Sequence, residues 1–226
     1  MKSRLSRPLP LAAVLIASLL SPVALLAGES DVYRSELFTS LKPVYEDRFD
    51  GALNTAFWEV RQGTTWTIQD GILTGNPSTK EFQEKMLAKG DKAHAGFKPV
   101  IWLKQVPERF VFTARLRHRA GAFMPRFPLI DLGHHVHTLS FSEKATTVTI
   151  RQNVQTLTVA EPLLTLNQWH DLAIELKPGQ LLLKIDDKKH LFESPHIDMA
   201  GQAQIDFKGI DLGTWEIDSV RLWEGQ

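Results

Sequence analysis

The chain has 226 residues, with 26 basic and 26 acidic side chains and no cysteine. Phosphate backbones are bound through concentrated positive charge, so this balance, with no local cluster of Lys and Arg, argues against a nucleic-acid partner. A chain of this length can bury one large core without disulfides, and the absence of cysteine excludes a thiol nucleophile.

The N-terminal segment has the pattern of a secretory signal peptide. Lys2, Arg4 and Arg7 precede an apolar run over residues 11–27, and small residues end that run. We therefore expect residues 1–27 to be a signal peptide and the protein to work in the periplasm of a bacterium or outside the cell. A retained N-terminal anchor is the alternative. Once the segment is cleaved, we expect no transmembrane span, and 23 basic and 26 acidic residues remain.

The rest of the chain reads mostly as short strands separated by turns. Residues 28–43 show little pattern and are interpreted as a lead-in, and residues 44–226 as a single domain. The run from Phe110 to Arg117 alternates between apolar and polar side chains, which is typical of a half-buried strand. Asp70-Gly71 stands between two apolar runs and predicts a tight hairpin.

Residues 78–96 are the one stretch that favours a helix, with a long irregular loop as the alternative. Ser78 or Thr79 offers an N-terminal cap, and Gly90 offers an end. Many short strands with at most one short helix predict an all-β fold, a two-sheet antiparallel β-sandwich of the jelly-roll type.

One segment, "NQWHDLAIELKPGQLLLKIDDKKHLF", resembles a known superfamily. Its Trp169-His170 pair, the turn at residues 177–179 and Asp186 are similar to the concanavalin A-like jelly rolls of the laminin-G-like branch. The opening "YEDRFDG" and the closing "WEIDSVRLWEG" agree with that resemblance. Over residues 44–224 the order of parts most resembles the bacterial 3-keto-disaccharide hydrolase domain. The resemblance implies a carbohydrate partner and hydrolysis of a keto-disaccharide.

The segment "DLGHHVHTLSF" carries three histidines in four positions. If it is one strand, His135 and His137 share a face and His134 points the other way. His135 and His137 are then candidate catalytic bases, or transition-metal ligands together with His94. The alternative is that they are ordinary polar residues at the end of a strand.

Carboxylates give no complete signature. Jelly-roll glucanases place their acidic pair in a Glu-x-Asp-x-x-Glu run, and this chain has none. Asp47 and Asp218 lie in the expected first and last strands, which are often neighbours in the superfamily, and they are candidate ligands of a structural calcium. Plain edge-strand carboxylates are the alternative.

Aromatic and planar polar side chains are candidates for sugar contacts. We expect substrate-binding residues among Trp102, Arg117, Arg126 and His134. Trp66 and Trp215 are further candidates, whereas the remaining tryptophans are expected in the core, namely Trp58, Trp169 and Trp223.

These observations support three functional hypotheses. The first is an exported carbohydrate-associated domain that binds a saccharide on its concave sheet. The second is a hydrolase or lyase acting on a keto-disaccharide or another glycoside through histidines, with or without a divalent metal. The third is a structural envelope protein without a small ligand. No cofactor is required by the first.

Overall fold

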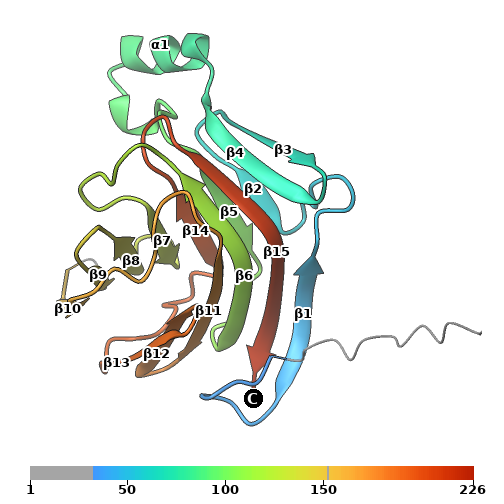
Figure 1. Ribbon diagram of the computed structural model, residues 1–226, viewed down its shortest axis with the longest axis vertical. Helices are drawn as coiled ribbons and strands as arrows, with labels where there is room; N and C mark the ends of the chain where they lie inside the picture. Colours follow the sequence, from blue (N-terminus) through green and yellow to red (C-terminus); the bar gives the residue numbers. More distant parts are fainter. Residues whose placement is uncertain (1–32, 152) are drawn as a thin grey trace, which may run out of the picture. The chain divides into compact units, whose positions relative to one another are not determined.

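The computed structural model describes residues 33–151 and 153–226, so the predicted signal peptide lies outside the described residues. Residues 35–226 form one compact unit built from two antiparallel sheets (Figure 1). The predicted fold class, an all-β two-sheet sandwich with one short helix, is confirmed. In the described part of the chain, no helix has the length and apolar character needed to cross a membrane.

Sheet A has eight strands, in the order β13-β12-β11-β6-β15-β4-β3, and β1 also pairs with β15. Their bounds are β1 Leu41–Asp47, β3 Thr64–Gln69, β4 Ile72–Ser78, β6 Phe110–Arg119, β11 His170–Lys177, β12 Gln180–Ile185, β13 Lys188–Glu193 and β15 Thr214–Gly225. The long strand β15 pairs with β6 along one edge, with a register shift between Ile217 and Ser219. Along its other edge, its first half pairs with β4 and its second half with β1.

Sheet B has seven strands, in the order β10-β9-β8-β7-β14-β5-β2. Their bounds are β2 Trp58–Val60, β5 Val100–Lys104, β7 Leu129–Leu132, β8 His137–Phe141, β9 Thr146–Ile150, β10 Gln155–Val159 and β14 Gln204–Lys208. The partners β7, β14 and β5 are distant in sequence, so the middle of this sheet is assembled from separate parts of the chain.

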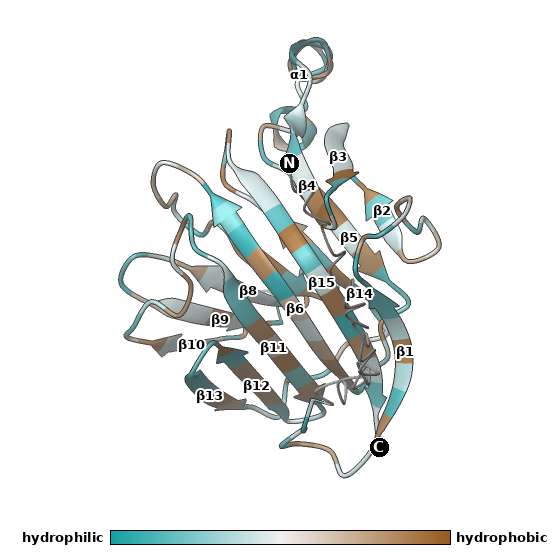
Figure 2. Cartoon of the chain, turned by 45° about the vertical axis from the view of Figure 1, so that its right-hand side comes forward, coloured by the Kyte–Doolittle hydropathy of each residue, from teal (hydrophilic) through white to brown (hydrophobic). Residues whose placement is uncertain are grey.

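The core lies between the sheets and follows the two-residue period of the strands. On β6 the buried side chains are Phe110, Phe112, Ala114 and Leu116, as predicted, and they alternate with Arg115 and Arg117 (Figure 2). Trp58 and Phe207 meet in the middle of the core, with ring centroids 6.2 Å apart. Burying each large apolar side chain contributes about 1.5–3 kcal/mol relative to leaving it exposed.

Two local predictions are confirmed by the backbone. Asp70 and Gly71 join β3 and β4 with φ values of 52° and 74°, the positive angles that a tight hairpin turn requires. The helix α1 spans Lys80–Ala88, and Thr79 caps it by accepting a hydrogen bond from the Phe82 N–H. The irregular-loop alternative is therefore wrong.

Part of the predicted lead-in is ordered. The strand β1 begins at Leu41, and its first residues pair with the end of β15. Before it, the segment 35–38, here called the strap, lies over the outer face of sheet A, where Glu175 on β11 accepts hydrogen bonds from Ser35, Glu36 and Leu37.

Candidate functional site

The outer face of sheet B carries a row of polar side chains across its central strands. On β5 and β14, Ile101, Leu103, Ile205 and Phe207 belong to the core, so the residues between them point away from it. Those residues are Trp102 and Asp206, which are direct partners across the two strands. Asp206 is in turn opposite Asp131 on β7, and Asp131 is opposite Thr138 on β8.

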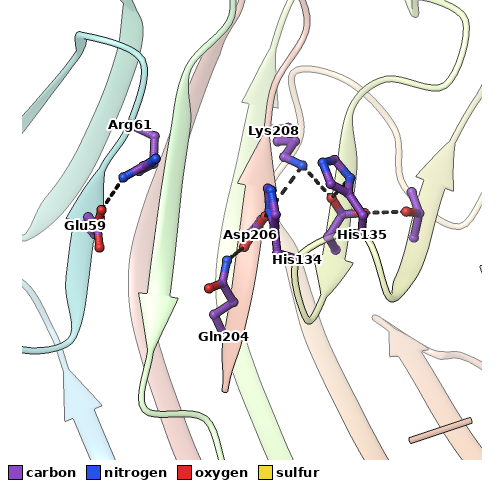
Figure 3. A network of polar contacts seen from close by, with 9 residues as sticks. Glu59, Arg61, His134, His135, Gln204, Asp206 and Lys208 are labelled. Carbon is purple, nitrogen blue, oxygen red and sulfur yellow. Dashed lines mark hydrogen bonds and ion pairs between the residues drawn. The ribbon is translucent and has the colours of Figure 1, made fainter. Parts of the chain in front are cut away.

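The centre of this row is a pair of buried carboxylates. Asp131 is 1% exposed and Asp206 is 0% exposed. The Lys208 ammonium bridges them, with its Nζ 2.5 Å from Asp131 Oδ2 and 3.5 Å from Asp206 Oδ2 (Figure 3). The Thr138 hydroxyl donates to Asp131, and the Gln204 amide donates to Asp206 Oδ1 at 2.6 Å.

Two histidines stand over these carboxylates. His134 Nδ1 lies 2.8 Å from Asp206 Oδ2, and His135 Nδ1 lies 3.6 Å from Asp131 Oδ2 (Figure 3). The His134 side chain is 42% exposed and the His135 side chain is 55% exposed. Each imidazole therefore contacts a buried carboxylate on one side and the solvent on the other. Partial burial and the nearby Lys208 charge lower the pKa of His135, which favours a neutral ring near pH 7.

The predicted strand geometry of the histidines is wrong. His134 and His135 lie in the turn that joins β7 to β8, where Gly133 and His135 have φ values of 68° and 61°. His137 is the first residue of β8 and is fully buried, with its Nε2 2.6 Å from the Asp198 carbonyl oxygen. Burial lowers its pKa. His135 and His137 therefore do not share an open face, and His137 is not placed to contact a substrate.

The predicted metal sites are not assembled. His94 lies in the short 3₁₀ helix at Lys92–His94, with its Nδ1 2.8 Å from Asp91 Oδ1. Over residues 33–151 and 153–226, no group of three or more His, Cys, Asp or Glu side chains is placed to hold a metal ion. The proposed set of His94, His135 and His137 is corrected on this ground.

The two calcium candidates each have protein partners. Asp47 accepts hydrogen bonds from the Tyr45 hydroxyl and, at 2.8 Å, from the Phe49 N–H. Asp218 lies in the bulged part of β15 and pairs with Arg115 at 3.4 Å. A structural calcium at these two aspartates stays a prediction.

Trp102 is the aromatic member of the cluster. Its ring lies between Arg61, whose guanidinium carbon is 4.0 Å from the ring centroid, and the imidazole of His134, whose centroid is 5.0 Å away. Arg61 pairs in turn with Glu59 on β2. We call Trp102, Asp131, His134, His135, Asp206 and Lys208 the sheet B cluster.

The predicted substrate-binding residues are divided between the two sheets. Trp102 and His134 are in contact, and Arg126 borders the same face farther along sheet B. Arg117 is on the outer face of sheet A, where it pairs with Glu216 and lies 4.7 Å from the ring centroid of Trp169.

The tryptophans show a similar division. Trp58 and Trp215 are buried in the core, so the core prediction is confirmed for Trp58 and the surface role considered for Trp215 is wrong. Trp169 and Trp223 are only partly buried and are not core residues. Trp66 packs on Gly75 of the neighbouring strand.

The sequence analysis missed Asp131, Asp206 and Lys208. A signal was present, since "LIDL" and "QIDFK" each place one aspartate inside an apolar strand. A carboxylate at such a position is expensive to bury unless it is paired. That cost could have identified both as site residues.

Comparison with known proteins gives fold relatives only. No family model matches the chain, and no curated protein matches it in sequence. Among solved structures it is similar to an endo-acting O-glycanase of human gut bacteria that initiates mucin breakdown, with a TM-score of 0.57, 14% identity and coverage of 82% of this chain and 100% of that one.

Two other solved structures are similar over most of their length. The laminarinase from Rhodothermus marinus has a TM-score of 0.53 and 14% identity, over 83% of this chain and 98% of that one. The carbohydrate recognition domain of Emp47p has a TM-score of 0.50 and 10% identity, over 86% and 100%. The chain therefore shares the two-sheet jelly-roll fold with these proteins, and this is the fold that the resemblance implied.

Proposed function

We propose that this protein binds a saccharide on the outer face of sheet B, at the sheet B cluster. One observation carries the proposal: a buried carboxylate pair, Asp131 and Asp206, lies directly beneath two half-exposed imidazoles and beside a tryptophan.

The energetics of that pair favour a functional role. Like charges directly opposite each other on neighbouring strands are destabilising, and burying them adds a desolvation cost of several kcal/mol per ion before pairing. Lys208, His134 and Gln204 offset this cost for Asp206. The carboxylates hold the imidazoles of His134 and His135 in place at the surface. Polar groups fixed in this way can bind sugar hydroxyls, and the ring of Trp102 can pack on the apolar face of the sugar.

The fold comparisons support this choice of ligand. Glycanases and a carbohydrate recognition domain share the jelly roll. The absence of a Glu-x-Asp-x-x-Glu run in this chain favours binding over the hydrolysis that jelly-roll glucanases perform.

The test is a glycan array followed by calorimetry with the best ligand. Trp102→Ala and His134→Ala should each weaken binding at least about tenfold, the effect of losing roughly 1.4 kcal/mol of contacts. Trp169→Ala, which removes an aromatic ring from the outer face of sheet A, is the matched control and should bind as the wild type does. Silence on both neutral and acidic glycans would instead favour a structural envelope protein.

A second candidate function is hydrolysis of a keto-disaccharide or another glycoside. Lys208 contacts Oδ2 of Asp131 at 2.5 Å and of Asp206 at 3.5 Å, so these two oxygens are at most about 6 Å apart, and retaining glycosidases hold their two carboxyl groups roughly 5–5.5 Å apart. A substrate has to displace the Lys208 ammonium to reach them, and the neutral imidazole of His135 is the candidate base.

Turnover separates the two functions. Incubating the protein with the glycans it binds and separating the products by chromatography shows whether a bond is cleaved. Asp131→Asn should abolish cleavage if the carboxylates react. Binding without cleavage in the wild type assigns the site to recognition alone.

We also propose that the protein is exported to the periplasm or the exterior. The pattern of residues 1–27 supports this. Cell fractionation and N-terminal sequencing test it: a mature protein that begins near Gly28 agrees with cleavage, and one that retains Met1 agrees with an anchor.

A further inference from the structure

A second feature of the outer face of sheet B lies beyond the sheet B cluster, over β8 and β9. A hollow of about 430 Å³ is lined there by Arg126, Ser140, Thr147, Thr149 and Asn153, with Phe141, Ser142 and Ala145 completing it. Arg126 comes from the loop before β7 and lines the hollow together with residues of β8 and β9.

Most polar side chains that line this hollow have no hydrogen-bond partner among the described residues. Within residues 33–151 and 153–226, the hydroxyls of Ser140, Thr147 and Thr149 make no hydrogen bond, and the guanidinium of Arg126 makes no ion pair or hydrogen bond. Ser142 differs, because its hydroxyl donates to the Ala145 carbonyl oxygen within the β8–β9 turn. The hollow thus combines one free cation with several free donors.

The charge of the lining is positive. Among the described residues that line it, Arg126 is the charged one and none is a carboxylate. Glu143 and Lys144 on the adjacent turn are both exposed and offset each other. A guanidinium surrounded by hydroxyl and amide donors is suited to a planar or tetrahedral oxyanion, which it binds through paired hydrogen bonds.

The hollow lies near the sheet B cluster on the same sheet. Thr138 donates to Asp131 and is the direct cross-strand partner of Thr149 in the hollow. Asp131 and Thr149 are therefore two strand spacings apart, about 10 Å between their backbones. A short oligosaccharide spans that distance, so one ligand can occupy both places.

We propose that this hollow is a subsite for an acidic sugar unit, which presents the carboxylate of a uronate or a sulfate ester to Arg126. The inference rests on the proposed saccharide binding and adds the chemical class of the ligand. The hydroxyls of Thr147 and Thr149 donate to the remaining oxygens of the anionic group or of its ring.

The test uses an array that carries neutral, uronate-containing and sulfated oligosaccharides, with tetragalacturonate and its fully methyl-esterified form as a matched pair. The wild type should prefer acidic glycans, and the ratio of uronate to sulfate binding identifies the anion. Arg126→Gln should reduce binding of acidic glycans about 10- to 100-fold, because hydrogen bonds to charged groups contribute that much. Neutral glycans should bind Arg126→Gln unchanged.

Matched variants place the effect in the hollow. Arg115→Gln makes the same change of charge on the outer face of sheet A and should bind acidic glycans as the wild type does. Thr147→Val removes a lining hydroxyl and should weaken acidic binding about threefold to tenfold, the effect of one net hydrogen bond. Thr158→Val changes its cross-strand partner on β10, which does not line the hollow, and should have no effect.

The outcomes distinguish this inference from the function on which it rests. If the protein binds glycans with no acidic preference, or if Arg126→Gln and Arg115→Gln behave alike, the acidic subsite is wrong while saccharide binding stands. If no glycan of any class binds, both are wrong.

Discussion

The outer faces of the two sheets bury their carboxylates in different ways. On sheet A, Glu175 is 0% exposed because the chain itself covers it: the strap donates to it through the Ser35 hydroxyl and the backbone N–H groups of Glu36 and Leu37. On sheet B, Asp206 is equally buried, and the groups that contact its carboxylate within the described residues are side chains, those of His134, Gln204 and Lys208.

That difference bears on the proposed roles of the two sites. Backbone donors of the strap cannot turn toward another partner without unfolding a segment of chain. Side chains over Asp206 can exchange a carboxylate contact for a ligand contact by changing rotamer. The comparison therefore supports our proposal that the buried charge of sheet A serves stability and that the buried charges of sheet B serve recognition.

The largest expected effect tests the structural half of the comparison. Glu175→Ala leaves the strap donors without an acceptor and should lower the free energy of unfolding by about 3 kcal/mol. Denaturant unfolding measures this, with Glu193→Ala on the exposed edge strand β13 as control. A loss under 1 kcal/mol would show that the strap does not hold its place through Glu175.

The next largest expected effect is a loss of stability at low pH that is caused by a buried histidine of the core. Burial lowers the pKa of His118 from 6.5 to about 3, and its Nε2 accepts a hydrogen bond from the Ile210 N–H at 3.0 Å. Below pH 6.5 the unfolded chain takes up a proton that the folded chain does not. Stability therefore falls as the pH drops from 6.5 toward 3, by about 2 kcal/mol at pH 5 from this residue.

Unfolding experiments between pH 7 and pH 5 check this contribution. His118→Gln should flatten the pH dependence, although the variant is less stable at pH 7. Equal slopes for the wild type and His118→Gln would contradict the assignment.

The sheet B cluster should give a smaller change in stability and a large change in binding. Asp206→Asn keeps the shape of the side chain and removes one of two facing charges, while Lys208 keeps its closer partner Asp131. We expect the free energy of unfolding to change by less than about 1 kcal/mol, because relief of like-charge repulsion offsets the weaker hydrogen bonds. Saccharide affinity should fall more than about tenfold, since His134 loses the carboxylate that orients it.

Unfolding and calorimetry on the same preparation test this prediction. A loss of several kcal/mol with unchanged affinity would make the cluster structural, as on sheet A. That result would remove the contrast between the two faces.

Sequence patterns predicted the parts of this fold that short-range chemistry determines. The alternation from Phe110 to Leu116, the Asp70-Gly71 hairpin and the Thr79 cap each depend on neighbouring residues alone, and all three are present. The histidine segment failed for a local reason as well: Gly133 begins a turn, where the sequence was interpreted as a continuous strand.

The candidate site depends on long-range pairing, which no local pattern reveals. Lys208 and Asp131 are 77 residues apart in sequence and meet only because β14 is inserted between β7 and β5. One sheet register fixes which residues face each other, and a shift of β7 or of β14 by one residue would turn the aspartate of that strand to the core face. The types of residue were visible in the sequence, but their convergence was not.

The smallest expected effect concerns the exposed charges of sheet A. Arg115 contacts Asp171 at 3.6 Å and Asp218 at 3.4 Å, and its side chain is 47% exposed. Because exposed ion pairs are screened by water and salt, Arg115→Ala should lower the free energy of unfolding by less than about 0.5 kcal/mol. The variant should also keep full saccharide affinity. A larger loss of stability would mean that the ion pairs on the outer face of sheet A contribute more than exposed ion pairs do. Any loss of affinity would mean that recognition is not confined to sheet B.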